Sequence, residues 1–284
     1  MSIKTKTARL SILSNTILII LKLVAGIISG SVSIISEAIH SFIDLIAAIM
    51  AFYSVKISSN PPDKRHPYGH GKYENISGVI EALLIFFAAI WIIFEAVKKM
   101  QGAEKIEFYG IGIIVMFISA LINFFISRKL YKVSKTTDSI ALEADALHLS
   151  ADVYTSAGVA LSLLLIWLTG WHILDPIVAI IVALFILKEA YLLIKIAFKP
   201  LVDESLSEDE INIISNIIRK SAGSNLSFHR LRTRKAGFIK FIDLHLELPG
   251  NLSVNEAHLI CDNIEKEIEN KIKNSEVTIH VEPS

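Results

Sequence analysis

The sequence is poor in the residues that several common functional classes require. It has one cysteine, Cys261, so no disulfide can form within the chain and a cysteine-rich zinc site is excluded. Its 28 basic residues are balanced by 28 acidic ones, which leaves no net positive charge to attract nucleic acid. It contains neither the HExxH pattern of zinc proteases nor the GxSxG turn of serine hydrolases. We therefore expect no nucleic-acid partner and neither of these two enzyme classes.

The N-terminus, MSIKTKTARL, also lacks the pattern of a cleavable signal peptide. What the sequence has instead is apolar residues, at 52% of the chain, and these are gathered into long blocks. A membrane-spanning helix needs about 20 mostly apolar residues. Six stretches meet this length, at residues 8–29, 31–58, 75–99, 108–133, 138–168 and 173–198. The pattern predicts an all-α membrane domain of six transmembrane helices over residues 1–200, followed by a soluble domain over 201–284.

The distribution of Lys and Arg predicts how these helices are oriented. Basic residues concentrate in loops on the cytoplasmic side of a membrane. Four segments that would lie on one side are rich in them: the N-terminus, the loop after the second helix, the loop after the fourth and the entry to the soluble domain. The two tight turns on the other side have none. We expect a multi-pass protein of the cell membrane, in contact with lipid, with both termini in the cytoplasm.

The soluble domain reads as a small α+β unit. Ser207 and Ser253 each begin a capping box, so helices are expected at about 208–222 and 254–272. Residues 226–234 and 238–248 read as strands, the second with apolar and polar residues in alternation, and Val277 to Val281 marks a last strand. The order αββαβ predicts a ferredoxin-like or metallochaperone-like sandwich with one open sheet face.

Two identical HxxxD pairs lie inside apolar blocks: His40 with Asp44, and His148 with Asp152. Residues four apart share one face of a helix. Ionisable side chains at membrane depth are costly and usually functional. Together the pairs offer two imidazoles and two carboxylates, a set that suits a tetrahedral Zn²⁺-like ion. The alternative is that each pair is a polar clasp between helices.

Two further groups could bind metal. Asp63, His66 and His70 lie in the segment PPDKRHPYGHGKYE between the second and third blocks, although its prolines and glycines also suit a plain solvated turn. The soluble domain offers a larger set, for which ordinary surface histidines are the alternative interpretation. Its members are His229, His245, His258, His280 and Glu282.

Across essentially its whole length, the chain resembles the cation diffusion facilitator family of metal/proton antiporters, above all its bacterial homodimeric members. The segments that carry the resemblance are SEAIHSFIDLIAA, PPDKRHPYGHGKYE, ALHLSADVYTSAG, LRTRKAGFIKFIDLHLEL, VNEAHLICDNIE and VTIHVEP. The resemblance implies efflux of a divalent transition metal, Zn²⁺ first, with Fe²⁺, Mn²⁺, Co²⁺ and Cd²⁺ as other candidates. It also implies that protons are the counter-ion and that the protein is a homodimer.

The resemblance assigns a role to each group. It makes the two HxxxD pairs the transport site, and the Asp63 group a loop site. It makes the five residues of the soluble domain a two-metal cytoplasmic site at the dimer interface, and Lys72 with Asp203 a charge interlock between the loop and that domain. Two departures matter: His40 stands where close relatives often have Asp, and Glu282 stands where they have Asp.

Two other functions compete with transport. The same ligands could serve an intramembrane metalloenzyme, but two symmetric pairs leave no obvious open position for a metal-bound water. The chain could also be a metal-sensing scaffold that does not transport. Retention of all four matched intramembrane ligands argues against that reading.

Overall fold

The computed structural model describes residues 2–29, 32–101, 110–171, 173–222 and 227–284. The chain divides into two compact units. The first comprises Met1–Pro61 and Tyr73–Phe198 and is helical. The second comprises Lys199–Ser284 together with the short segment Pro62–Lys72, which lies between two helices of the first unit in sequence. The loop therefore groups with the C-terminal residues, next to the expected Lys72–Asp203 interlock, although the boundary expected at residue 200 counted it with the membrane domain.

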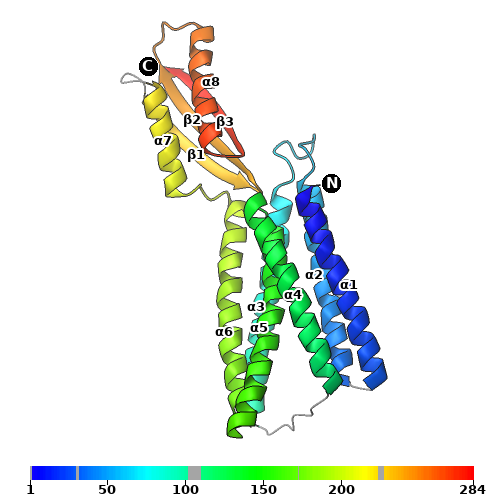
Figure 1. Cartoon of the computed structure of the whole chain (residues 1–284). Helices are drawn as coiled ribbons and strands as arrows, with labels where there is room; N and C mark the ends of the chain where they lie inside the picture. Colours follow the sequence, from blue (N-terminus) through cyan, green and yellow to red (C-terminus); the bar gives the residue numbers. More distant parts are fainter. Residues whose placement is uncertain (1, 30–31, 102–109, 172, 223–226) are drawn as a thin grey trace. The chain divides into compact units, whose positions relative to one another are not determined.

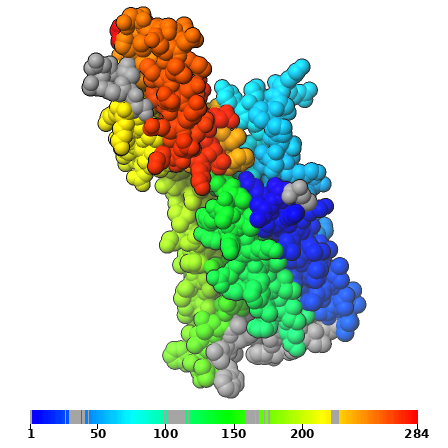
Figure 2. Space-filling view, turned by 45° about the horizontal axis from the view of Figure 1, so that its top comes forward, coloured from blue at the N-terminus to red at the C-terminus, as the bar shows by residue number. Residues whose placement is uncertain are grey.

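The helical unit consists of six long helices with apolar surfaces (Figure 1). Their bounds are α1 Ile3–Ser29, α2 Val32–Ser58, α3 Lys72–Gln101, α4 Gly110–Thr137, α5 Ile140–Thr169 and α6 Leu174–Phe198. Helix α1 packs along α2 and along α4, and α5 packs along α4 and α6. Figure 2 shows α4 beside α1 on one face of this unit. Large apolar side chains such as Phe87, Trp91 and Phe117 are exposed, as expected where a protein surface faces lipid.

Among the residues that the structure describes, three segments are long and apolar enough to cross a membrane: Ile3–Ala25, Lys72–Lys98 and Pro176–Val202. They lie in α1, α3 and α6. The expected number of six membrane crossings therefore stays a prediction.

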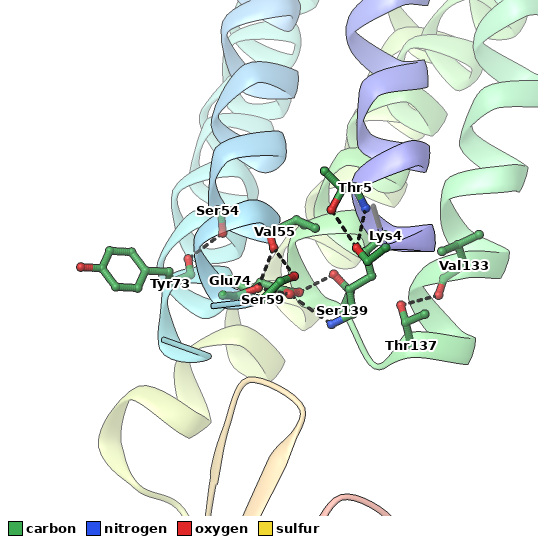
Figure 3. A network of polar contacts seen from close by, with 12 residues as sticks. Lys4, Thr5, Ser54, Val55, Ser59, Tyr73, Glu74, Val133, Thr137 and Ser139 are labelled. Carbon is green, nitrogen blue, oxygen red and sulfur yellow. Dashed lines mark hydrogen bonds and ion pairs between the residues drawn. The ribbon is translucent and has the colours of Figure 1, made fainter. Parts of the chain in front are cut away.

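A buried carboxylate joins the helices at one end of the bundle (Figure 3). The Glu74 side chain, on α3, is only 2% exposed. Its Oε1 accepts hydrogen bonds from Lys4 Nζ of α1 at 3.2 Å and from Ser58 Oγ of α2 at 2.6 Å. Its Oε2 accepts a hydrogen bond from Ser139 Oγ, just before α5. One side chain thus connects α1, α2, α3 and the start of α5. The Lys4 ammonium and the hydroxyls of Ser58 and Ser139 offset the cost of burying its charge.

The second unit contains the predicted αββαβ order. After a short 3₁₀ turn at Lys199–Val202 come α7 Glu208–Ala222, β1 Ser227–Ala236, β2 Ile239–Leu248, α8 Val254–Lys271 and β3 Ser275–Pro283. The sheet order is β1-β2-β3, with β1 antiparallel and β3 parallel to β2. Both expected capping boxes form, at Ser207–Glu210 and at Ser253–Glu256.

The core of this unit lies between the two helices and one face of the sheet. The alternating apolar residues of β2 are buried there against Ile214 and Ile218 of α7 and Ile264 and Ile268 of α8. Because successive strand residues point to opposite faces, the polar residues of β2 occupy the other, uncovered face. The predicted sandwich with one open sheet face is therefore confirmed.

The segment Pro62–Lys72 is fastened to this unit at the turn between β1 and β2. Gly71 lies so close to that turn that a Cβ on it would be 2.3 Å from the carbonyl oxygen of Ala236. The Arg234 guanidinium stacks on the Tyr68 ring at 4.5 Å and on the Phe241 ring at 4.7 Å, distances typical of cation–π contacts. The loop and the C-terminal sheet are therefore one packed body.

Candidate metal centres

Among the residues that the structure describes, three groups of His and acidic residues lie close enough to hold a metal ion, and all three come from the sets identified in the sequence. The first is inside the helical unit and combines Asp44 of α2 with His148 and Asp152 of α5. One ligand atom from each lies within 4.8 Å of the others. His148 Nε2 is 2.9 Å from Asp44 Oδ1. Asp44 and His148 are 104 residues apart in sequence, so the two HxxxD pairs meet through three of their four members.

The fourth member, His40, lies on α2 one turn before Asp44, and its side chain is outside the described part of the structure. A residue that the sequence analysis did not select, Asn123 of α4, donates a hydrogen bond from Nδ2 to Asp152 Oδ2 at 3.3 Å. This contact orients a carboxylate of the group from a third helix. Asn123 is a buried amide in the apolar stretch of α4 before Ser127, which is the signal that could have identified it.

The first group suits a transition-metal dication chemically. Asp44 is 4% exposed, so an ionised carboxylate here needs a positive partner. Two carboxylates and an imidazole are hard and borderline ligands that favour Zn²⁺ or its neighbours in the first row. Asp44 lies near the middle of α2, and His148 and Asp152 lie in the first half of α5, so the group is away from the helix ends.

The second group, Asp63, His66 and His70, lies in the loop that packs on the C-terminal sheet. Asp63 Oδ1 accepts hydrogen bonds from the backbone amides of Arg65 at 2.8 Å and His66 at 2.7 Å, so a tight turn presents the carboxylate. The His66 amide, more than any other contact, lowers the pKa of Asp63 below its usual value. His70 Nε2 lies 3.3 Å from Asp63 Oδ2. The carboxylate is thus kept ionised and placed between two imidazoles.

The third group lies on the open face of the C-terminal sheet and contains His229, His245 and Glu282. The strand register places His229 opposite His245, and His245 opposite His280. His245 Nδ1 lies 2.8 Å from Glu282 Oε1, and this hydrogen bond is the main reason that the pKa of Glu282 is lowered. Directly after His229 the β1–β2 register shifts, and Arg230 has a φ of 50°. This bulge ends the regular pairing beside the histidines, as bulges near functional sites often do.

The two remaining predicted members of the third site, His280 and His258, differ in how close they lie to that group. The His280 ring is 4.7 Å from the His245 ring, and its Nε2 is 3.7 Å from Glu282 Oε1, so it borders the group. His258 is on α8, largely exposed, with its Nε2 3.5 Å from Asp262 Oδ1. Within one chain, then, four of the five residues are neighbours and His258 belongs to another surface.

The Lys72–Asp203 pair is formed, with 2.8 Å between Nζ and Oδ1. Lys72 is the main cause of a lowered pKa at Asp203. Arg234, which also contacts Tyr68, approaches the same carboxylate oxygen at 3.7 Å. Asp203 has a left-handed backbone with φ 55°, which an aspartate tolerates better than most residues. The loop is therefore held to the C-terminal unit by charge as well as by stacking.

Comparison with known proteins covers both units. A family model described as a cation efflux transmembrane domain matches residues 8–202, and one described as the cytoplasmic domain of cation efflux proteins matches residues 206–284. An uncharacterized transporter of Synechocystis is 36% identical, over 93% of this chain and 85% of its own. The cation-efflux pump FieF of Shewanella oneidensis is 33% identical, over 97% of this chain and 93% of its own. The solved metal-bound C-terminal domain of the CzcD transporter from Thermotoga maritima is 32% identical, with a TM-score of 0.25, covering 28% of this chain and 94% of that one.

Proposed function

Because the chain belongs to the cation efflux family of membrane transporters, and not to a family of enzymes, we propose that it exports a divalent transition metal from the cytoplasm. The observation that carries this proposal is the meeting of Asp44, His148 and Asp152 inside the helical unit. A metal bound by this group would have ligands from two different helices, α2 and α5. A site between helices that can move relative to one another is what a transporter needs.

Zn²⁺ is the proposed substrate. An Asp44–His148–Asp152 group with His40 one helical turn away would offer two nitrogen and two oxygen ligands, the mixture typical of tetrahedral zinc sites. Fe²⁺, Co²⁺, Mn²⁺ and Cd²⁺ can use the same ligands with other preferences. The cation-efflux name of the Shewanella relative is consistent with any of these ions.

The proposed direction is outward, with both termini in the cytoplasm. The starts of α1, α3 and α5 and the ends of α2, α4 and α6 lie at one end of the bundle (Figure 1). That end carries most of the basic residues in the segments that join or precede the helices. They are Lys4, Lys6, Arg9, Lys64, Arg65, Lys72, Arg128, Lys129, Lys132, Lys135, Lys195 and Lys199. Such a bias favours the cytoplasmic side.

The proposed driving force is proton antiport. Metal binding requires ionised carboxylates and neutral imidazole, so protons and metal compete for the same lone pairs. Histidine titrates near neutral pH, which makes the competition effective at physiological proton concentrations. Protons arriving from outside would therefore displace the metal on that side.

Reconstitution into vesicles with a trapped fluorescent zinc indicator tests this function. We expect zinc flux that is driven by a proton gradient and that stops when an ionophore collapses the gradient. Asp152→Ala should abolish flux because the ion loses a ligand in a low-dielectric site, whereas Asp209→Ala, an exposed residue of α7, should not change it. Undiminished gradient-independent flux in wild type would exclude antiport, and native flux in Asp152→Ala would remove Asp152 from the site.

We further propose that the C-terminal unit is a metal-dependent homodimerisation module. Its His229–His245–Glu282 group and His280 lie on the sheet face that no helix covers, so a second copy could complete the coordination. Metal that binds only the paired state stabilises pairing by mass action. A fragment of residues 201–284 contains the whole apolar core of this unit. It should dimerise more tightly with Zn²⁺ than with a chelator, and His245→Ala should remove the difference. Equal self-association under both conditions would exclude metal-dependent pairing.

A further inference from the structure

Two buried carboxylates in the helical unit belong to none of the three metal groups. Glu81 of α3 is 0% exposed and Asp145 of α5 is 1% exposed. Glu81 lies in the first half of α3, seven residues after Glu74. Asp145 precedes His148 by three residues, about 4.5 Å along the helix axis. Asp145 is thus placed between the start of α5 and the candidate transport site.

Each of these carboxylates has one bonded oxygen and one unbonded oxygen. Ser77 Oγ donates to Glu81 Oε1 at 3.3 Å, and Ser11 Oγ donates to Asp145 Oδ1 at 3.0 Å. Glu81 Oε2 and Asp145 Oδ2 are buried and have no hydrogen-bond partner among the residues that the structure describes. An ionised carboxylate can accept about four hydrogen bonds, so two buried anions with one bond each would be poorly solvated. A proton on each free oxygen removes that cost.

The packing of α3 on α5 brings the two carboxylates into one environment. Ala82 and Ala144, their immediate neighbours in sequence, lie in the same buried cluster. One turn before Glu81, Gly78 lies so close to Ile140 that a Cβ on it would be 2.5 Å from Ile140 Cγ2. Small residues let helix backbones approach in this way. The contact between α3 and α5 therefore keeps both carboxyl groups in apolar surroundings, where two negative charges are unfavourable.

Glu81 and Asp145 also interact electrostatically with residues of the candidate transport site. Glu81 interacts electrostatically with Asp145 and with His148, and Asp145 interacts with His148 and with Asp44. These are the charged groups that act on the pair from α2, α3 and α5. A dication held by Asp44, His148 and Asp152 would add positive charge within that range. Metal binding therefore favours loss of protons from acids that do not themselves hold the metal.

We propose that Glu81 and Asp145 are proton-carrying residues of the transport cycle, distinct from the metal ligands. This inference rests on the proposed antiport. In the metal-free state each acid holds one proton on its free oxygen. When the dication enters, an O–H bond breaks, the proton leaves to bulk water and the carboxylate stays as a counter-charge. When the metal leaves, a proton from water restores the O–H bond.

The experiment is a proton count for zinc binding to the full-length protein in detergent near pH 7. Calorimetry in buffers of different ionisation enthalpy gives the number of protons released per zinc. Glu81→Gln and Asp145→Asn keep shape and remove the titrating group. We expect each to release up to one proton fewer than wild type, and to retain zinc stoichiometry with affinity within a few-fold. Glu143→Gln is the matched control because Glu143 is also on α5 but pairs with Lys135, which is exposed. It should release as many protons as wild type.

A second measurement uses wild-type protein only, so it stays informative even if the variants fail to fold. In wild-type protein, infrared difference spectra should contain the C=O band of a protonated carboxylic acid that disappears when zinc is added. If both variants release as many protons as wild type, or if that band is absent, then Glu81 and Asp145 do not carry protons and have a structural role only. Loss of one bound zinc in either variant would make these residues metal ligands instead. If wild type binds zinc without releasing protons, or carries no proton-driven flux, the proposed antiport itself fails.

Discussion

The Cα of Gly71 lies against the β1–β2 turn where Gly237, with φ 62°, follows Ala236, and neither glycine leaves room for a side chain. A Cβ on Gly237 would lie 2.7 Å from Gly71 Cα. The two glycines therefore allow the loop of Asp63, His66 and His70 to reach the C-terminal sheet. The Lys72–Asp203 pair and the stacking of Tyr68 on Arg234 join the same loop to the same unit.

Gly71→Ala should therefore loosen the loop from the sheet. The obstructing atom is backbone and cannot rotate away, so we expect a loss of about 1–3 kcal/mol from overpacking. Hydrogen exchange of the β1–β2 turn in the full-length protein should rise, and zinc affinity of the loop group should fall. Gly250→Ala is the matched control because its Cβ would meet Pro283 at an ordinary 3.6 Å. Unchanged exchange in Gly71→Ala would show that the loop is not held at this point.

Asn123→Ala should weaken zinc binding at the Asp44–His148–Asp152 group without removing a ligand. The Asn123 amide orients the Asp152 carboxylate, and loss of such a supporting contact costs roughly 10–100-fold in metal affinity. Competition with a chromophoric chelator would measure it. Asn212→Ala, an exposed residue of α7, should leave affinity unchanged. Native affinity in Asn123→Ala would mean that Asp152 is oriented by its own helix alone.

His40→Asp tests whether the ligands set metal preference. The change replaces a borderline nitrogen with a hard oxygen, which suits Mn²⁺ better than Zn²⁺. We expect the ratio of Mn²⁺ to Zn²⁺ flux to rise several-fold in vesicles. The same ratio in variant and wild type would indicate that helix packing, and not this ligand, determines selectivity.

The pH dependence of the tail group should follow its histidines and not Glu282. The pKa of Glu282 is lowered by its hydrogen bond with His245, so the carboxylate stays ionised below the ordinary range of a glutamate, and the bond is lost only as pH falls through the lowered value. Histidine protonates near pH 6.5 and then competes with metal. Zinc affinity of the 201–284 fragment should therefore fall between about pH 7 and pH 5.5 while Glu282 is still ionised. Glu282→Gln should lower affinity at every pH and keep the midpoint. A shift of the midpoint in that variant would assign the transition to the carboxylate.

Local patterns were enough to predict the C-terminal unit. The alternation along β2 and the capping boxes at Ser207 and Ser253 depend on neighbours within a few residues, so the sequence contains them directly. The pairing of Asp44 with His148 was predicted because two rare motifs repeat in apolar blocks. In each case the signal is a regular spacing or an ionisable residue in an apolar context.

The features that the sequence did not reveal depend on contacts between distant segments. Asn123, Glu81 and Asp145 lie on three different helices, α4, α3 and α5. Only the packing of the helices shows which side chains each of them contacts. The docking of Tyr68 on Arg234 joins a loop to a strand more than 160 residues later. Asp44, His148 and Asp152 could be selected from the sequence because they belong to a repeated HxxxD motif. Glu81 and Asp145 could not, because they belong to no motif.

Glu74 holds α1, α2, α3 and the start of α5 together at one end of the bundle through three partners, Lys4, Ser58 and Ser139. Farther along α1, the contacts include the apolar pair of Ala25 with Val115 of α4 and one hydrogen bond from Lys22 Nζ to Ser41 Oγ of α2 at 2.8 Å. Apolar surfaces slide at little cost, whereas a shared carboxylate must lose its partners to separate. If the helices tilt to expose a bound ion first to one side of the membrane and then to the other, we expect them to move least at Glu74 and most at their opposite ends.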